Sequence, residues 1–439
     1  MPTNTMWAQR LELKYFRGIR SLALDFDKNI TVLVGVNGVG KTSILEALRI
    51  LLSVLTTDIL DELHDVRFDV SKAARKPSLP TKADIFVGQE DMSLSFEAHI
   101  KNKPLSWSVR THSPLHVGIV KTTIEPHNTE TRDFAKELAQ ANVADTEIEL
   151  PLAVYYSLGR GSDWGNPWSN VEDEKPPNQL SAYEGALSGA GISSISQFTS
   201  WFRRLEDYEN EKRIEEPTFR DKQLQAVRRV VEELLPDFSV LRIRRQPLRM
   251  VIRKGATELD IMQLSDGERY LLTLGADIAR RLALSNPLAE EARLCSAVIL
   301  IDEIETHLHP SWQRRVVPAL ARAFPNCQFI IATHSPQVLS EIRPESIYVL
   351  TQKDGEISVS HPEASFGRDS NRILEDLMGV DERPSEIKEK RGDYFHLLDQ
   401  GRMEEAQLLR QSLEARIGSS EPEFTRADVL VHTRELLSK

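Results

Sequence analysis

The chain has 439 residues, of which 40% are hydrophobic and 28% are charged, and its formal net charge is −11. This composition is typical of a globular protein and excludes a collagen-like or wholly disordered chain. At roughly 150 residues per domain, the length predicts two or three domains. The negative charge gives no general attraction for polyanions, so any contact with nucleic acid must come from a local patch.

The cysteine count and the hydropathy pattern indicate a cytoplasmic location. The two cysteines, Cys295 and Cys327, each lie in or beside an apolar run, which excludes a disulfide framework and a Cys-rich zinc site. No segment approaches the ~18 consecutive apolar residues of a membrane helix, and the N-terminus lacks a signal pattern. We therefore expect a cytoplasmic protein that does not enter a membrane.

The first half of the chain predicts strands around one long helix. Residues 11–34 predict two edge-type strands followed by a buried strand, and apolar residues at helical spacing predict a helix over 42–55. A loop is expected over 61–84, short antiparallel strands over 85–124 and a buried strand over 152–156. The segment 162–181 is rich in Pro, Asn, Ser and Gly and is predicted to be mobile.

The second half predicts helices and buried strands in alternation. Residues 183–235 are expected to be mostly helical with a break at Pro217, and a charged hairpin follows at 239–254. A helix is predicted at 265–284, a strand at 297–301, a helix at 311–323 and a strand at 329–332. After a turn at Asp354-Gly355, the last 75 residues predict about three amphipathic helices. There are no internal repeats and no sustained heptads, which excludes a long coiled-coil arm.

A phosphate-binding loop lies between the predicted strand and helix near residue 40. Residues 35–42, Gly-Val-Asn-Gly-Val-Gly-Lys-Thr, match the pattern G-x-x-x-x-G-K-[ST]. Backbone N–H groups of such a loop converge on phosphate oxygens, and the helix N-terminus adds positive charge. An ordinary Gly-rich turn does not explain the flanking strand and helix, so we expect the chain to bind ATP. The predicted nucleotide-binding residues are Gly35, Asn37, Gly38, Gly40, Lys41, Thr42 and Ser43, with Lys41 at the β/γ-phosphates and Thr42 at Mg²⁺.

Two further buried strands end in residues suited to ATP hydrolysis. The strand at 297–301 leads into Asp302 and Glu303, of which Asp302 suits Mg²⁺ and Glu303 can polarise a water. The strand at 329–332 leads into Thr333 and His334, and the histidine can hydrogen-bond the γ-phosphate or the attacking water. The ordinary alternatives are a solvated acidic turn and a satisfied structural histidine. His307 and His309 have poor spacing for a metal pair.

The segment Leu264-Ser265-Asp266-Gly267-Glu268-Arg269 stands at the start of an apolar helix. Ser265 and the N–H group of Gly267 can form an anion site for a γ-phosphate. The same residues form a capping box, with Ser265 as the N-cap and Glu268 at the third helical position. The two roles are compatible, because the same residues can cap the helix and bind a phosphate. Capping without phosphate binding is the alternative to the functional interpretation.

Together these motifs resemble the ABC/SMC/RecF class of P-loop ATPases. The segment 302–310, Asp-Glu-Ile-Glu-Thr-His-Leu-His-Pro, resembles the branch that includes the OLD nucleases and several bacterial defence ATPases. Residues 13–19 resemble the opening strand of that branch. Residues 366–376 resemble the ATPase subunit of the Septu anti-phage system and its retron-associated relatives. Leu264–Arg269 resembles the ABC signature motif, whose serine, in the family, binds ATP held by the other subunit.

The resemblance implies an ABC-type α/β fold with an antiparallel subdomain, a helical insertion and a helical C-terminal segment. We expect an ATPase domain over 1–350, with core lobes at 1–160 and 239–350 and an insertion at 161–238, and a helical segment over 351–439. The sequence departs from the branch in two respects. No nuclease module is visible after residue 350, and the glutamine that senses Mg²⁺ in this class is not identifiable, although Ser157–Gly161 occupies a plausible place.

Two other surfaces are candidates for partner binding. Six basic residues and no acid occur over 242–254, which suits either a DNA track or a solvated hairpin; they are Arg242, Arg244, Arg245, Arg249, Arg253 and Lys254. The tail has apolar residues at helical spacing that suit either a partner or the tail's own core, namely Tyr394, Leu397, Leu398, Ala406, Leu408, Leu409, Leu413 and Ile417.

The leading hypothesis is therefore an ATPase that dimerises around two ATP molecules with Mg²⁺. By resemblance to Septu, it would control a separate HNH-type nuclease in antiviral defence, with DNA as a further partner. The alternative is a RecF-like DNA-repair ATPase that binds DNA itself. The nucleotide-binding subunit of a membrane transporter is disfavoured by the long insertion and by Asp266 in the signature segment.

Overall fold

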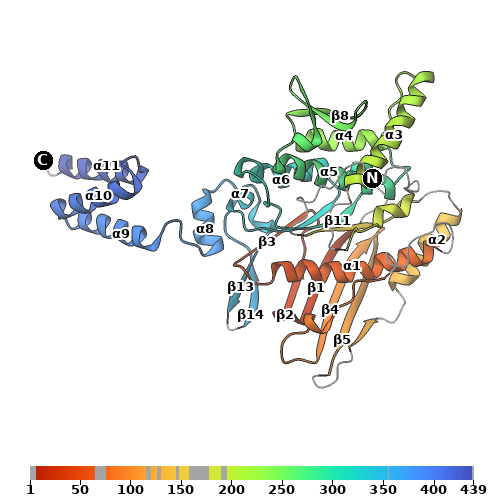
Figure 1. Cartoon of the computed structure of the whole chain (residues 1–439). Helices are drawn as coiled ribbons and strands as arrows, with labels where there is room; N and C mark the ends of the chain where they lie inside the picture. The colour runs from red at the N-terminus through yellow and green to blue at the C-terminus, as the bar shows by residue number, and fades with distance from the viewer. Residues whose placement is uncertain are drawn as a thin grey trace. The chain divides into compact units, whose positions relative to one another are not determined.

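A computed structural model describes residues 6–64, 76–114, 120–125, 130–144, 148–157, 177–188, 195–353 and 355–437. The chain divides into two compact units, Met1–Ile373 and Leu374–Lys439. Figure 1 shows the elements of both units. The larger unit contains all the described strands and has the mixed α/β fold that the sequence predicted.

A six-stranded sheet forms the centre of the larger unit, with the strand order β14-β13-β3-β12-β11-β7. The neighbouring strands β3, β12, β11 and β7 run parallel to one another. Strand β13 is parallel to β3 but antiparallel to β14. The four strands β3, β7, β11 and β12 read as continuous apolar runs because both faces of the sheet are covered. The bounds are β3 (Ile30–Val34), β7 (Leu152–Tyr156), β11 (Ala297–Asp302), β12 (Gln328–Ala332), β13 (Ile347–Lys353) and β14 (Glu356–Ser360).

A second, antiparallel sheet has the strand order β2-β1-β4-β5-β6. Its strands alternate between buried and exposed residues, as expected for a sheet with one face on the core. The prediction of two edge-type strands is right for β2 but wrong for β1, because β4 pairs with the free side of β1. The bounds are β1 (Met6–Phe16), β2 (Ile19–Asp25), β4 (Asp91–Ile100), β5 (Lys103–His112) and β6 (Lys121–Glu125).

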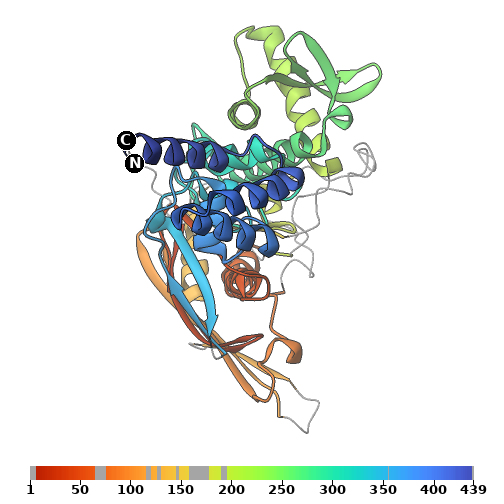
Figure 2. The ribbon, with the colours of Figure 1, turned by 90° about the vertical axis from the view of Figure 1, so that its left-hand side faces the viewer.

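Helix α1 (Lys41–His64) lies between these two sheets, as the end-on view of this helix in Figure 2 shows. Because both sides are covered, α1 is apolar around most of its circumference. The loop expected from residue 61 begins later, since Ile59, Leu60 and Leu63 are still buried in the last turns of α1. The described residues 177–188 include the short 3-10 helix η2 (Gln179–Tyr183), whereas residues 162–176 and Asp354 lie outside the described part of the chain.

The remaining helices and a small sheet complete the larger unit. A three-stranded sheet has the order β10-β9-β8 and contains the predicted charged hairpin. The helices are α2 (Glu130–Ala144), α3 (Ile195–Glu215), α4 (Lys222–Leu234), α5 (Asp266–Ser285), α6 (Pro310–Ala323) and α7 (Pro336–Leu339), and the strands are β8 (Phe238–Arg245), β9 (Leu248–Lys254) and β10 (Thr257–Asp260). Short 3-10 helices lie at Lys82–Asp84, Ile261–Gln263, Ala292–Leu294 and Pro344–Ser346.

The C-terminal unit is a bundle of helices with its own apolar core. Its helices are α9 (Ser385–Asp399), α10 (Met403–Ile417) and α11 (Pro422–Leu437), and the unit boundary falls within α8 (Ser370–Met378). Most of the apolar positions predicted as a possible partner surface belong to this core or pack against it. Leu408 is the exception, with 68% of its surface exposed. The apolar spacing of the tail is thus explained by the unit's own packing.

Candidate functional site

The phosphate loop follows β3 directly and continues into α1, as the sequence predicted. A Cβ atom at Gly35 would lie 2.5 Å from the carbonyl oxygen of Leu350 on β13, so only glycine fits there. Gly40 has a φ of 112°, a conformation that side chains with a Cβ rarely adopt. Asn37, Gly38 and Thr42 are exposed at the surface of the loop, whereas Ser43 is half-buried.

Lys41 is buried at the base of the loop, with 5% of its surface exposed. Its Nζ donates hydrogen bonds to the carbonyl oxygens of Gly35, at 2.8 Å, and of Val36, at 3.2 Å. Burial lowers the pKa of the ammonium, while the nearby carboxylates of Asp302, Glu305 and Glu303 raise it. The lysine is therefore a charge held inside the loop, close to three acids.

Asp302 ends β11, and its carboxylate is 4% exposed. Burial raises its pKa, and a hydrogen bond from the Thr42 hydroxyl opposes the shift. Its Oδ2 is buried and has no hydrogen-bond partner among the described residues. A hydroxyl beside a carboxylate with a free oxygen fits Mg²⁺, which takes one or two protein oxygens and completes its shell with water and phosphate.

Within the described ranges, no three His, Cys, Asp or Glu side chains come together as a metal cage. His309 caps α6, because its Nδ1 accepts a hydrogen bond from the N–H group of Ser311.

Glu303 follows Asp302 in a left-handed backbone conformation, with a φ of 50°. Such a φ is unfavourable for a residue with a side chain and is retained where the surroundings impose it. The Glu303 carboxylate accepts a hydrogen bond of 3.3 Å from the Thr306 hydroxyl and is half-buried. The left-handed backbone turn after β11 therefore orients the Glu303 side chain independently of the Asp302 side chain.

Glu305 is a site residue to which sequence analysis gave no role. Its carboxylate accepts hydrogen bonds from the Thr333 hydroxyl, at 2.7 Å, and from the backbone N–H of His334, at 2.6 Å. It therefore joins the segment after β11 to the segment after the neighbouring strand β12. The only sequence signal was the third acid in the Asp-Glu-Ile-Glu segment.

His334 is half-buried at the end of β12, next to Glu305. Burial lowers its pKa, as does the positive charge of Lys41, and the carboxylates of Glu305 and Glu303 act in the opposite direction. Because the net shift is downward, the imidazole is neutral near pH 7 and can either donate or accept a hydrogen bond.

Gln313 on α6 makes a second connection between the same two segments. Its Nε2 donates to the carbonyl oxygen of Leu308, at 2.9 Å, and its Oε1 accepts from the Ser335 hydroxyl, at 2.7 Å. The segments that carry Glu303 and His334 are therefore joined by two independent side chains. Sequence analysis gave no indication of this contact, because α6 lies outside the recognised motifs.

The segment around Ser265 forms the predicted capping box at the start of α5. The Ser265 hydroxyl lies 2.8 Å from Oε2 of Glu268, and Lys254 on β9 donates to the other carboxylate oxygen at 2.6 Å. Ser265 itself is exposed. A Cβ atom at Gly267 would lie 2.9 Å from the carbonyl oxygen of His307, so the start of α5 packs closely on the segment after β11.

A buried polar network fixes α5 to the central sheet. Asp277 on α5 accepts hydrogen bonds from Tyr156 at the end of β7, at 2.9 Å, and from Arg281, at 2.8 Å. Arg281 is fully buried and also donates to the carbonyl oxygens of Ala182 and Glu184. Since β7 pairs with β11, this network places the helix that begins at Ser265 on the sheet that carries Asp302.

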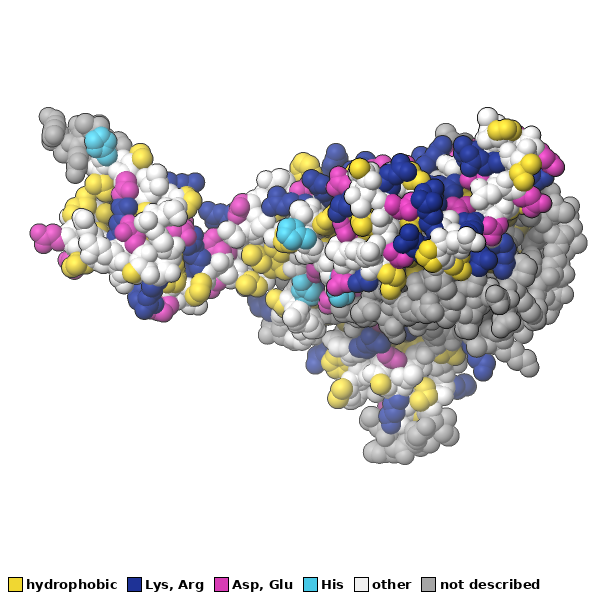
Figure 3. All heavy atoms as spheres, turned by 45° about the horizontal axis from the view of Figure 1, so that its top comes forward, with side chains coloured by type: hydrophobic (Ala, Val, Ile, Leu, Met, Phe, Trp, Pro, Cys, Tyr) yellow, Lys and Arg dark blue, Asp and Glu magenta, His cyan; other side chains and the backbone are white. Residues whose placement is uncertain are grey.

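The predicted basic hairpin is present as β8 and β9. Figure 3, which faces the side of the molecule with α3, α4 and β8, shows many Lys and Arg side chains with acids between them. Arg245 pairs with Glu206, at 2.6 Å, and with Asp207. Part of the basic character of the hairpin thus serves to hold it against α3.

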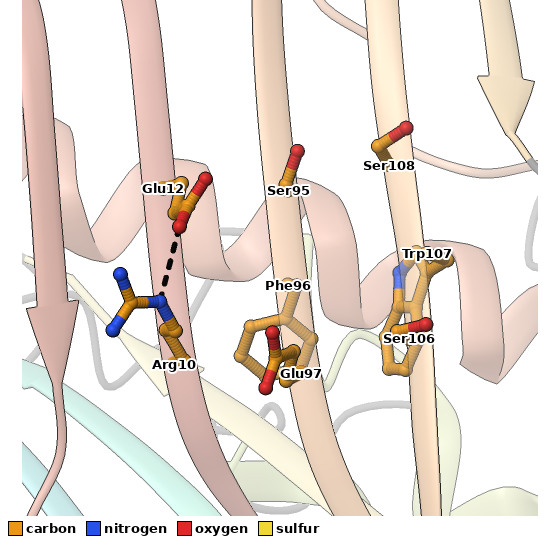
Figure 4. A pocket seen from close by; sticks show the side chains of 8 residues that line it. All are labelled: Arg10, Glu12, Ser95, Phe96, Glu97, Ser106, Trp107 and Ser108. Atoms are coloured by element: carbon orange, nitrogen blue, oxygen red, sulfur yellow. Dashed lines mark hydrogen bonds and ion pairs between the residues drawn. The ribbon is translucent and has the colours of Figure 1, made fainter.

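A shallow hollow of about 390 Å³ lies on the outer face of the antiparallel sheet. Figure 4 shows that Arg10, Glu12 and Glu97 stand on this face with several serines, while Phe96 and Trp107 point toward α1. The hollow belongs to a different sheet from the phosphate loop, and no sequence motif maps to it.

The three parallel strands β3, β12 and β11 are neighbours, so their carboxyl ends bring Lys41, His334, Asp302 and Glu303 to one edge of the central sheet. A phosphate loop combined in this way with an acidic strand end and a capped helix inserted before that strand is the arrangement of ABC-type P-loop ATPases, and the fold and site have the features of this class.

Comparison with known proteins agrees with this class. Residues 130–340 match a family described as "AAA domain, putative AbiEii toxin, Type IV TA system", and residues 6–79 match "Protein of unknown function (DUF2813)". The "Retron Ec83 probable ATPase" of Escherichia coli is 29% identical, over 86% of this chain and 77% of the relative. "Septu protein PtuA" of Bacillus thuringiensis is 24% identical, over 86% and 85% of the two chains.

A solved structure, "Crystal structure of the SmcHead bound to the C-winged helix domain of ScpA", aligns with a TM-score of 0.48 and 18% identity. The alignment covers 81% of this chain and 98% of that chain. None of the described helices of this protein has the length and apolar composition needed to span a membrane.

Proposed function

We propose that the chain is the ATP-hydrolysing subunit of an anti-phage defence complex, that it dimerises around two ATP molecules, and that it controls a separate HNH-type DNA nuclease. The observation that carries the proposal is the meeting of Lys41, Asp302, Glu303 and His334 at the ends of three neighbouring strands. The relatives named as a retron ATPase and as Septu PtuA support the defence role.

Each residue of the site has a distinct task in the proposed reaction. The loop N–H groups and Lys41 bind the β- and γ-phosphates of ATP, and Glu303 accepts a proton from the attacking water. His334 is neutral and hydrogen-bonds the γ-phosphate or this water, while Glu305 and Gln313 position its segment. Mg²⁺, when bound, is held by Thr42 and Asp302 and neutralises charge on the phosphate oxygens.

The signature segment completes the site of the neighbouring subunit. Ser265 is exposed at a helix start, and its hydrogen bonds run to Glu268 within its own capping box. An exposed helix N-terminus with a hydroxyl favours an incoming anion. We therefore assign Ser265 and the N–H of Gly267 to the γ-phosphate of ATP bound by the partner copy, which makes ATP the element that joins two chains.

The nuclease is proposed as a separate chain in the cytoplasm. The direct test is to express this chain with the product of the neighbouring reading frame. An HNH protein that co-purifies with it, and whose DNA cleavage changes when Lys41 is replaced by alanine, would support the proposal. Full protection against phage by this chain alone, with no second protein, would contradict it.

A RecF-like DNA-repair ATPase is the second candidate, and the exposed arginines Arg249 and Arg253 on β9 favour it. This role requires strong, salt-dependent binding of DNA ends by the chain without any partner. DNA affinity that rises when the probe has free ends, compared with a closed circle, would favour this alternative over control of a nuclease.

A further inference from the structure

The three-stranded sheet β10-β9-β8 has two chemically different faces. One face is apolar and buried, with Leu241, Ile243, Met250 and Ile252. The strand register places Arg244 opposite Arg249 and Glu258 opposite Arg253, and Arg242 and Arg244 are two residues apart. Because residues opposite each other, and residues two apart, share one face of a sheet, the other face carries Arg242, Arg244, Arg249 and Arg253 around the buried Val251. We call these four residues the arginine face.

Acids neutralise only part of the arginine face. Glu258 accepts hydrogen bonds from Arg242, at 2.6 Å, and from Arg244, at 2.9 Å, which lower the pKa of its carboxyl to about 2. Asp260 lies on the same face, but its carboxylate caps the 3-10 helix at Ile261–Gln263. The side chains of Arg249 and Arg253 are exposed and make neither an ion pair nor a hydrogen bond within the described part of the chain.

The other two basic residues of the same hairpin form ion pairs with acids of neighbouring helices. Arg245 is held by Glu206 and Asp207 of α3, and Lys254 by Glu268 of α5. These two residues therefore have a structural explanation, whereas among the described residues only Glu258 pairs with members of the arginine face. The six basic residues therefore form two groups: two that hold the hairpin against neighbouring helices, and four that make up the arginine face.

The arginine face also carries an unfavourable arrangement for the free protein. Arg244 and Arg249 lie directly opposite each other, and like charges in this position destabilise a sheet, with Glu258 offsetting only the charge of Arg244. An anionic ligand would relieve this repulsion. Since the whole chain has a net charge of −11, this attraction is local and not a general property of the surface.

We propose that the arginine face binds the phosphate backbone of double-stranded DNA, without reading its sequence. The planar guanidinium group makes paired hydrogen bonds with phosphate oxygens, which suits it to this ligand better than lysine. Arginines on neighbouring strands can contact successive phosphates, and Figure 3 shows Lys and Arg side chains, with acids between them, on the side of the molecule where β8 lies.

The test is fluorescence anisotropy of a labelled 30-base-pair duplex with the full-length chain, without nucleotide, from 50 to 200 mM KCl. The double variant Arg249→Gln/Arg253→Gln removes two phosphate contacts, so the slope of log affinity against log salt should fall by about 1.8. We expect about a tenfold loss of affinity at 100 mM KCl. The matched control, Arg402→Gln/Arg416→Gln, removes the same charge from exposed residues of the C-terminal unit.

An equal loss in both double variants, or a wild-type chain that does not bind the duplex at 50 mM KCl, would overturn the proposal. Displacement of the duplex by poly-glutamate as effectively as by unlabelled duplex would also overturn it, since the face would then bind any polyanion. The variants should fold, because the Arg249 and Arg253 side chains have no partner to lose among the described residues, and circular dichroism checks this. Lys41→Ala should keep its DNA affinity, which separates this proposal from that of ATP hydrolysis.

Discussion

The buried network of Asp277 gives the clearest link between stability and the site. Asp277→Ala leaves Arg281, which is fully buried, without its carboxylate, and it removes the acceptor of the Tyr156 hydroxyl. Removal of one partner of a buried ion pair costs about 3–5 kcal/mol. Because proteins are stable by only about 5–15 kcal/mol, this is a large share of the total.

Urea unfolding followed by circular dichroism measures this loss. The control is Asp207→Ala, which removes an exposed acid from helix α3 and should change the stability by less than about 0.5 kcal/mol. A loss below about 1 kcal/mol for Asp277→Ala would refute the reasoning, since Arg281 would then have found water or another partner. We also expect slower ATP turnover in this variant under conditions where it is folded, because α5 and β7 are no longer held together.

Three further predictions concern the site itself. Lys41→Ala should abolish ATP binding in calorimetry while the circular dichroism spectrum is retained, and unchanged affinity would sink the assignment of the phosphate loop. Glu303→Gln should bind ATP and hydrolyse it about 10²–10⁴ times more slowly, whereas wild-type turnover would move the base elsewhere, with His334 next. Glu305→Gln removes a negative charge that raises the pKa of His334, so this pKa should fall further below 6.5 in an NMR titration. In the wild type, the lowered pKa of His334 means that its contribution to stability is complete above about pH 6.5 and is lost as the pH falls toward the folded pKa. A His334 pKa that rises in Glu305→Gln would contradict this electrostatic account.

The sequence predicted the parts of the site that depend on short local patterns. The phosphate loop, the capping box of Ser265 and the strand that ends at Asp302 each lie within a few neighbouring residues, and their geometry follows from local conformation. The helix after Lys41 was predicted too short, because a helix buried between two sheets loses the periodicity that marks an exposed face.

Contacts between distant segments could not be predicted in this way. Glu305 acts through residues almost 30 positions away, and Tyr156 meets Asp277 across more than a hundred. The hairpin arginines looked like one cluster, but β10 supplies Glu258 from outside the hairpin and α3 supplies Glu206. Only the register of the sheet separates the paired arginines from the exposed ones.

The central claim is that ATP joins two copies of this chain, with Ser265 of one facing the phosphate loop of the other. Cysteines placed at Asn37 and Asp266 test it with a short thiol-specific crosslinker, since both positions are exposed and the native Cys295 and Cys327 are buried. In a Glu303→Gln background, we expect crosslinks between chains when ATP is present and none without it. Crosslinks confined to single chains, or equally frequent without nucleotide, would contradict it.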